Sequence, residues 1–182
     1  LIGFAGAPFT VASYLIEGGP SRDLAKTKAM MIGDPGLFAA LLGRLADLAV
    51  MFLRAQIEAG ASAVQLFDSW VGALPSRLYR EHVLPHTRRV FEQVADLGVP
   101  RVHFAVGAGH LATDMAAAGC DVLGVDFRVD LTQVDPAIRG RMPLQGNLDP
   151  AVLLTGQATI EREVRRVLAS GQGLRGHVFN LG

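Results

Sequence analysis

Hydrophobic residues along the chain fall into short continuous runs, separated by longer stretches in which apolar positions recur with a helical period. Six short runs, each bounded by Gly, Pro or Asp, predict β-strands. They cover residues 1–5, 63–67, 101–104, 122–126, 142–145 and 177–181. Because the runs are continuous rather than alternating, they are typical of parallel strands that are covered on both faces.

Helices are predicted between these strands. Apolar stripes with helical spacing cover residues 38–52, 79–94 and 160–168. Asp34 followed by Pro35 predicts an N-cap and first turn, and Gly60 and Gly98 fit helix ends. Strand and helix therefore alternate, which indicates a parallel sheet with crossover helices.

Two architectures have this order, an open doubly wound sheet and a (β/α)₈ barrel. Six strands in 182 residues match a barrel that lacks two of its eight units. The segment GFAGAP at residues 3–8 is not the GxGxxG that usually follows the first strand of an open dinucleotide-binding sheet. We therefore expect an incomplete barrel, in a single domain over residues 1–182. Leu1 and Gly182 both adjoin apolar runs, so we expect an internal part of a longer protein.

Composition narrows the choice of partners. Half of the residues are apolar, and 17 Lys and Arg balance 17 Asp and Glu, which argues against disorder and against a nucleic acid partner. The most apolar stretch, residues 37–59, contains four charged residues, which argues against a membrane span. Cys120 is the single cysteine, so the chain has no internal disulfide or multi-cysteine zinc site, and we expect a buried small side chain.

Candidate chemistry is expected in the loops that follow the strands, where parallel α/β folds place their sites. Polar residues in these loops include Tyr14, Asp68, Ser69, His110, Asp126, Arg128, Asn147, Asp149 and Asn180. No nucleophile and base are adjacent, and neither Lys26 nor Lys28 is at a strand end, so Schiff-base chemistry is not indicated. These residues alone indicate a barrel with a polar mouth and leave the reaction open.

Two patterns have a structural interpretation that outweighs the functional one. Gly107 and Gly109 fit a turn better than a phosphate-binding loop, because no P-loop lysine follows them. His82 and His86 have the spacing of a metal pair, but Pro85 interrupts the segment and no HExxH is present. We therefore expect a solvated helix face there.

Two other patterns leave both interpretations open. Asp126 and Arg128 form either a site pair or a structural ion pair. Phe4 and Phe67 belong either to the core or to an aromatic lining at the mouth of the barrel.

Six segments at these loops carry a family resemblance. They are LIGFAGAPFT (1–10), SYLIEGG (13–19), QLFDSWVG (65–72), GVDFR (124–128), LQGNLDP (144–150) and FNLG (179–182). In this order and spacing they resemble the uroporphyrinogen decarboxylases across essentially the whole chain. The resemblance implies a cytoplasmic, homodimeric (β/α)₈ barrel. Its activity would remove the four acetate carboxyls of uroporphyrinogen III to give coproporphyrinogen III, without metal or organic cofactor.

The resemblance also implies site residues. Tyr14 and Ser69 match the family's substrate-binding tyrosine and serine, and Phe4 and Phe67 match aromatics that line its cleft. A protonated pyrrole ring of the substrate can serve as the electron sink, which fits a site without lysine or cofactor. The enzyme would then fix the macrocycle, stabilise its charge and deliver protons.

Departures from the family limit these expectations. The family's arginine-rich loop and pyrrole-holding aspartate belong before Leu1, and its histidine belongs just after Gly182. No catalytic residue is therefore assigned in this chain, and we expect the isolated chain to have little activity. Phe127 replaces the usual tryptophan. One alternative is a cobalamin-linked methyltransferase of the same fold, but these carry His-x-Cys where this chain has HFA (103–105). A non-catalytic binding fragment is another.

Overall fold

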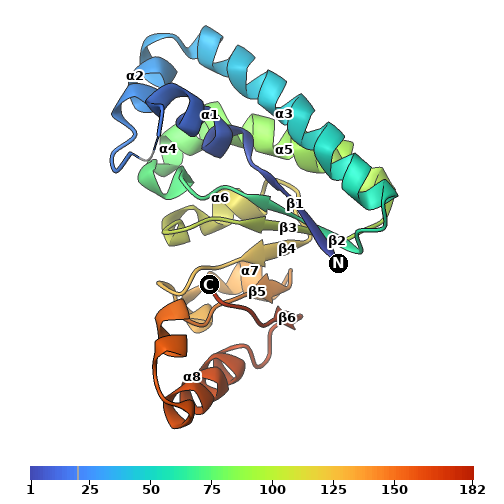
Figure 1. Ribbon diagram of the computed structural model, residues 1–182, viewed down its shortest axis with the longest axis vertical. Helices are drawn as coiled ribbons and strands as arrows, with labels where there is room; N and C mark the ends of the chain where they lie inside the picture. The colour runs from blue at the N-terminus through green and yellow to red at the C-terminus, as the bar shows by residue number, and fades with distance from the viewer. Residues whose placement is uncertain (20) are drawn as a thin grey trace.

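Six parallel strands form one sheet in the computed structural model, which describes residues 1–19 and 21–182 (Figure 1). The strands are β1 (Ile2–Gly6), β2 (Ala63–Phe67), β3 (Arg101–Phe104), β4 (Val122–Gly124), β5 (Leu144–Gln145) and β6 (His177–Val178). Each strand pairs with the next one along the chain. A barrel gives this consecutive order, whereas an open doubly wound sheet reverses its strand order at one point. The predicted incomplete (β/α)₈ barrel is therefore confirmed.

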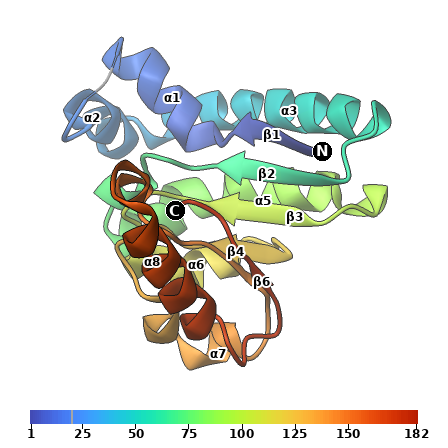
Figure 2. The same ribbon diagram turned by 60° about the horizontal axis from the view of Figure 1, so that its bottom comes forward.

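Helices connect the strands, and those at residues 35–58 and 84–93 lie behind β1, β2 and β3 in Figure 2. The α-helices are α1 (Pro8–Glu17), α2 (Ala25–Gly33), α3 (Pro35–Glu58), α4 (Ser76–Leu78), α5 (Leu84–Gln93), α6 (Ala112–Ala116), α7 (Pro136–Arg139) and α8 (Gln157–Ser170). Short turns of 3₁₀ or π helix are η1 (Val71–Ala73), η2 (Tyr79–Val83), η3 (Ala95–Leu97), η4 (Gly109–Leu111), η5 (Leu131–Gln133) and η6 (Pro150–Leu154). The predicted start of α3 is confirmed, because the Asp34 carboxylate accepts a hydrogen bond from the Leu37 amide at 3.0 Å.

Helix α3 corrects one expectation from the sequence. Over an 18-residue window its mean hydropathy is 1.8, so by length and composition it could cross a membrane. Two of the four charged residues of this segment, Arg54 and Glu58, lie near the end of the helix, so an 18-residue window with only two charges remains before them. In the fold the helix contacts α1, α5 and β1 and buries Phe38, Leu42 and Leu53. It therefore takes the place of a core helix over the sheet.

The outer face of the sheet is almost entirely apolar. Successive residues of a strand point to opposite faces, and the strand register places five residues in one row across the sheet. The row consists of Ala5, Leu66, His103, Leu123 and Leu144, all of them buried. His103 is the one polar residue in this row, and its ring lies 5.3 Å from the ring of Phe91 in α5. The row therefore lies in the layer between the sheet and the helices.

Candidate functional site

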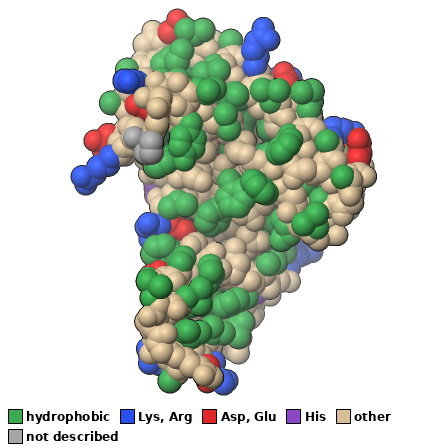
Figure 3. All heavy atoms as spheres, viewed as in Figure 1, with side chains coloured by type: hydrophobic (Ala, Val, Ile, Leu, Met, Phe, Trp, Pro, Cys, Tyr) green, Lys and Arg blue, Asp and Glu red, His purple; other side chains and the backbone are tan. Residues whose placement is uncertain are grey.

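The inner face of the sheet carries an aromatic hollow. Phe4, Phe67 and Phe104 come from three adjacent strands, and their rings meet edge to face at 5.7 and 5.8 Å. With Ile2, Gln65, Asn180 and Leu181 they line a hollow of about 340 Å³. Exposed hydrophobic side chains gather in the middle of Figure 3, where Figure 1 shows the strands.

Exposure decides between the two interpretations of Phe4 and Phe67. Phe4 is 58% exposed and Phe67 is partly exposed, so both lie on the lining of the hollow rather than in the closed core. Position 124 requires glycine, because a Cβ there would come within 2.9 Å of the Phe104 side chain. The glycine of the GVDFR segment therefore makes room for the third aromatic ring.

The two hydroxyl residues lie at the carboxyl ends of the strands, near each other but outside the lining of the hollow. Tyr14 is on α1, which follows β1, and is 48% exposed. Ser69 is in the turn that follows β2 and is partly buried. The ring of Trp70, the next residue, meets the Tyr14 ring edge to face at 5.8 Å. The structure therefore brings the predicted site residues together as two pairs, Phe4 with Phe67 and Tyr14 with the turn that contains Ser69.

A buried polar network lies behind this turn. The Asp68 carboxylate accepts a hydrogen bond from the Thr10 hydroxyl at 3.1 Å, and its other oxygen lies 3.6 Å from Nε2 of His103. The side chains of Asp68 and His103 are both fully buried. Burial by itself lowers the pKa of His103, but the neighbouring Asp68 carboxylate and Cys120 outweigh it and raise the pKa to about 9. The imidazole is therefore protonated at neutral pH, and the pair is an ion pair.

Sequence reasoning missed this network. Asp68 was expected to contribute to a polar mouth, and His103 was considered only as half of a missing His-x-Cys pair. The one local signal was a histidine between two apolar residues of its strand, Val102 and Phe104. A histidine at such a position needs a buried partner, but the sequence does not indicate which residue provides it.

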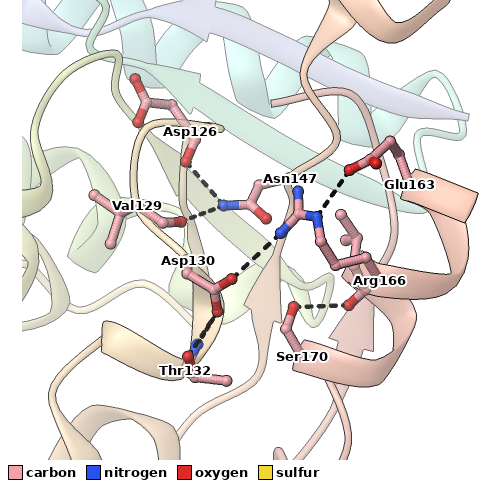
Figure 4. Close-up of polar contacts among 9 residues, drawn as sticks. Asp126, Val129, Asp130, Thr132, Asn147, Glu163, Arg166 and Ser170 are labelled. Carbon is pink, nitrogen blue, oxygen red and sulfur yellow. Dashed lines mark hydrogen bonds and ion pairs between the residues drawn. The ribbon is translucent and has the colours of Figure 1, made fainter. Parts of the chain in front are cut away.

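Asp126 and Arg128 form an ion pair in the loop after β4. Oδ2 of Asp126 lies 2.5 Å from Nη1 of Arg128 and accepts a hydrogen bond from the Gly107 amide, also at 2.5 Å. Gly107 has φ of +63°, so the turn interpretation of this glycine is supported, and its N–H is already bonded. The Asn147 side chain donates to the carbonyls of Asp126 at 2.9 Å and Val129 at 2.6 Å (Figure 4). These contacts hold the loops after β4 and β5 to each other.

The remaining candidates do not form a site. His82 lies in η2 and His86 in α5, both partly exposed. Burial, followed by the charge of Arg89, lowers the pKa of His86. Within residues 1–19 and 21–182, no three His, Cys, Asp or Glu side chains are grouped to hold a metal ion. Cys120 is buried, as expected.

The chain is an incomplete α/β barrel with an aromatic hollow on its inner face and hydroxyl groups at the carboxyl ends of its strands, the end at which barrel enzymes place their active sites. The family model for uroporphyrinogen decarboxylase (URO-D) matches residues 1–182, and the chain belongs to this family. The resemblance seen in the six sequence segments is therefore confirmed.

Three bacterial relatives, each named uroporphyrinogen decarboxylase, illustrate the similarity. The chain is 60% identical to the protein of Streptomyces coelicolor over 182 residues and 56% identical to that of Saccharopolyspora erythraea over 192 residues. It is 58% identical to the protein of Rhodococcus erythropolis over 187 residues. All of this chain is covered in each case, but only 51%, 53% and 53% of the relatives. The chain thus spans about half the length of the curated relatives it matches.

Proposed function

We propose that this chain is part of a complete protein that decarboxylates uroporphyrinogen III to coproporphyrinogen III. The observation that carries the proposal is the match of all 182 residues to one family whose relatives have this activity in their names. Each acetate side chain would lose its carboxyl group as CO₂ and gain a proton on the remaining carbon, which becomes a methyl group. The electron pair released at that carbon would be held by a protonated pyrrole ring of the substrate itself.

In this proposal, the chain's own residues hold and orient the substrate. The exposed hydroxyl of Tyr14 and the hydroxyl of Ser69 can each donate a hydrogen bond to a carboxylate, which is worth about 1.5–3 kcal/mol. The rings of Phe4, Phe67 and Phe104 offer an apolar surface to the flat rings of the macrocycle. Their faces also favour positive charge, which develops on the substrate during the reaction.

The activity is tested with the complete protein and uroporphyrinogen III, with coproporphyrin measured by fluorescence after separation and oxidation. We expect coproporphyrinogen to form. Its absence, while a known uroporphyrinogen decarboxylase succeeds in parallel, contradicts the proposal. The 182-residue chain alone, assayed beside it, is expected to show little product.

The two hydroxyl groups are tested by Tyr14→Phe and Ser69→Ala in the complete protein. We expect each to raise KM by about tenfold, because each loses a charge-assisted hydrogen bond. Tyr79→Phe is the matched control, since Tyr79 is the chain's other tyrosine and is fully buried. Unchanged kinetics in Tyr14→Phe and Ser69→Ala would remove both residues from the site.

We also propose that the complete protein is a cytoplasmic homodimer, as the family resemblance implies. Light scattering during size-exclusion chromatography tests the dimer, and a monomer at micromolar concentration would contradict it.

A further inference from the structure

A charged pair is buried where apolar residues would pack well. His103 lies in its row between Leu66 of β2 and Leu123 of β4, and both neighbours are buried. Replacing a buried ion pair by hydrophobic residues of similar volume is often neutral or stabilising. Packing alone therefore does not account for a fully buried Asp68 and His103 at this position. What the pair does provide is a fixed direction for the Asp68 carboxylate.

That carboxylate connects two segments of the candidate site. The Thr10 hydroxyl donates to Asp68 at 3.1 Å and accepts a hydrogen bond from the Trp70 amide at 3.4 Å. Thr10 is on α1, one helical turn before Tyr14. Ser69 lies between Asp68 and Trp70 in the turn after β2. One hydroxyl thus ties the helix that carries Tyr14 to the turn that carries Ser69.

Backbone contacts hold the turn at both of its ends. The Ala7 amide, just before α1, donates to the Phe67 carbonyl at 2.8 Å, and the Val71 amide donates to the Asp68 carbonyl at 3.3 Å. The Asp68 amide donates to the Phe104 carbonyl at 2.8 Å, which continues the pairing of β2 with β3. Beyond Asp68, the Trp70 amide bonds to the Thr10 side chain rather than to another backbone group. The side-chain contacts of Thr10 with Asp68 and with the Trp70 amide therefore add to these backbone contacts and join the middle of the turn, where Ser69 lies, to α1.

We propose that Thr10, Asp68 and His103 are positioning residues that fix the Tyr14 hydroxyl relative to the Ser69 hydroxyl. His103 holds the Asp68 carboxylate, Asp68 orients the Thr10 hydroxyl, and Thr10 holds the turn against α1. The inference rests on the proposed function, because it takes Tyr14 and Ser69 as the groups that bind the substrate's carboxylates. It assigns no contact with substrate to the three network residues.

The kinetic test uses Thr10→Val in the complete protein, because valine keeps the shape of the side chain and removes its hydroxyl. We expect KM to rise about threefold to tenfold with a smaller change in kcat, the loss expected for one hydrogen bond. Thr10→Ser restores the hydroxyl and is expected to restore KM. Thr87→Val is the matched control, since Thr87 is also buried but its hydroxyl has no hydrogen-bond partner among the described residues.

A second, activity-independent readout follows the geometry of the turn. Trp70 is the chain's single tryptophan. The complete protein is labelled with 5-fluorotryptophan, and the Trp70 fluorine resonance is assigned by its loss in Trp70→Phe. We expect Thr10→Val, Asp68→Asn and His103→Gln to shift or broaden this resonance, and Thr87→Val to leave it unchanged.

The outcomes separate the inference from the proposed function. If the wild-type protein does not convert uroporphyrinogen, the proposed function fails, whatever the variants do. If the wild type is active but Thr10→Val matches Thr87→Val in KM and in the fluorine spectrum, the positioning role is overturned. Tyr14→Phe combined with Thr10→Val is the sharpest case. If Thr10 acts through Tyr14, the combined rise in KM falls below the product of the two single rises. A combined rise in KM equal to the product of the two single rises would contradict the inference.

Discussion

The two ends of the sheet are built differently. In the first region, β1 to β3 with their helices, the strands have five, five and four residues, and α3 and α5 cover them. Its largest fully buried side chains include Phe38, Tyr79 and Phe91. In the second region, β4 to β6 with α7 and α8, the strands have three, two and two residues. Helix α8 buries one residue, Val167.

The polar contacts of the two regions differ in the same way. The first region places a fully buried ion pair, Asp68 with His103, beneath its mouth. The second region attaches α8 to the loop after β4 through exposed contacts, such as Arg166 with Asp130 at 3.3 Å (Figure 4). Breaking a buried pair leaves an unpaired charge in a medium of low dielectric constant, whereas water replaces a lost partner at the surface. The loss of the buried Asp68–His103 pair is therefore expected to cost more stability than the loss of an exposed pair in the second region.

The largest expected effect comes from Asp68→Ala. It leaves the charged His103 without a partner, and we expect a loss of about 3–5 kcal/mol in the free energy of unfolding. Urea unfolding followed by circular dichroism measures the loss. Asp68→Asn, which keeps the shape and one acceptor, is the control and is expected to lose less. Both variants remove the charge of Asp68, so equal losses would mean that the charge alone accounts for the effect, and no loss in either variant would contradict the buried ion pair.

The next effect is a dependence on pH. The pKa of His103 is about 9, above its ordinary value of 6.5, so the folded protein holds this proton more tightly than the unfolded chain. The stabilisation is therefore complete below pH 6.5 and is lost as the pH rises through about 9. We expect it to amount to about 3 kcal/mol. Unfolding measured at pH 6 and pH 9.5 tests this.

The control for the pH effect is His103→Gln, which removes the titrating group. The groups that act on the His103 imidazole are Asp68 and Cys120. The pKa of His86 is lowered from its ordinary value of 6.5. Its contribution to stability therefore increases as the pH rises, opposite to that of His103, and it changes below pH 6.5. A variant that loses as much stability as the wild type between pH 6 and pH 9.5 would contradict the assignment to His103.

The strands could be predicted where local hydrophobicity and pairing agree. Residues 63–67 and 101–104 are strands with the predicted bounds, because β2 and β3 are paired on both sides along their length. Residues 142–145 and 177–181 shorten to two residues each. These apolar runs are longer than the segments that pair, because β5 and β6 share only two residue pairs. Bounds there depend on the neighbouring strand, which a local pattern does not contain.

The candidate site could be predicted where single residues carried the signal. Phe4 and Phe67 were found from the family resemblance, and the structure places them side by side. The buried network was missed because it depends on pairs that are distant in sequence. Thr10 and Asp68 are 58 positions apart, and nothing local indicates that they meet. Pairing of this kind emerges only from the order of strands in the sheet.

In the second region, the largest effect is expected from Asn147→Ala. The buried Asn147 side chain donates to the carbonyls of Asp126 and Val129, and alanine leaves both without this donor. We expect a loss of about 1–3 kcal/mol, less than for Asp68→Ala. Urea unfolding measures it, and Gln133→Ala, at an exposed position of η5, is the control. A loss as large as that of Asp68→Ala would remove the distinction between the two regions.

The smallest effect is expected from Arg166→Ala on α8. Its guanidinium bonds to Asp130 and Glu163, but its side chain is 54% exposed, so water and salt compete for these contacts. We expect a shift in the unfolding midpoint below that of Asn147→Ala, and we expect it to shrink further in 1 M NaCl. Asp68→Ala, measured in the same two buffers, should keep most of its loss, because salt does not reach a buried pair. An Arg166→Ala shift that is large and insensitive to salt would mean that α8 is held by buried electrostatics, as the first region is.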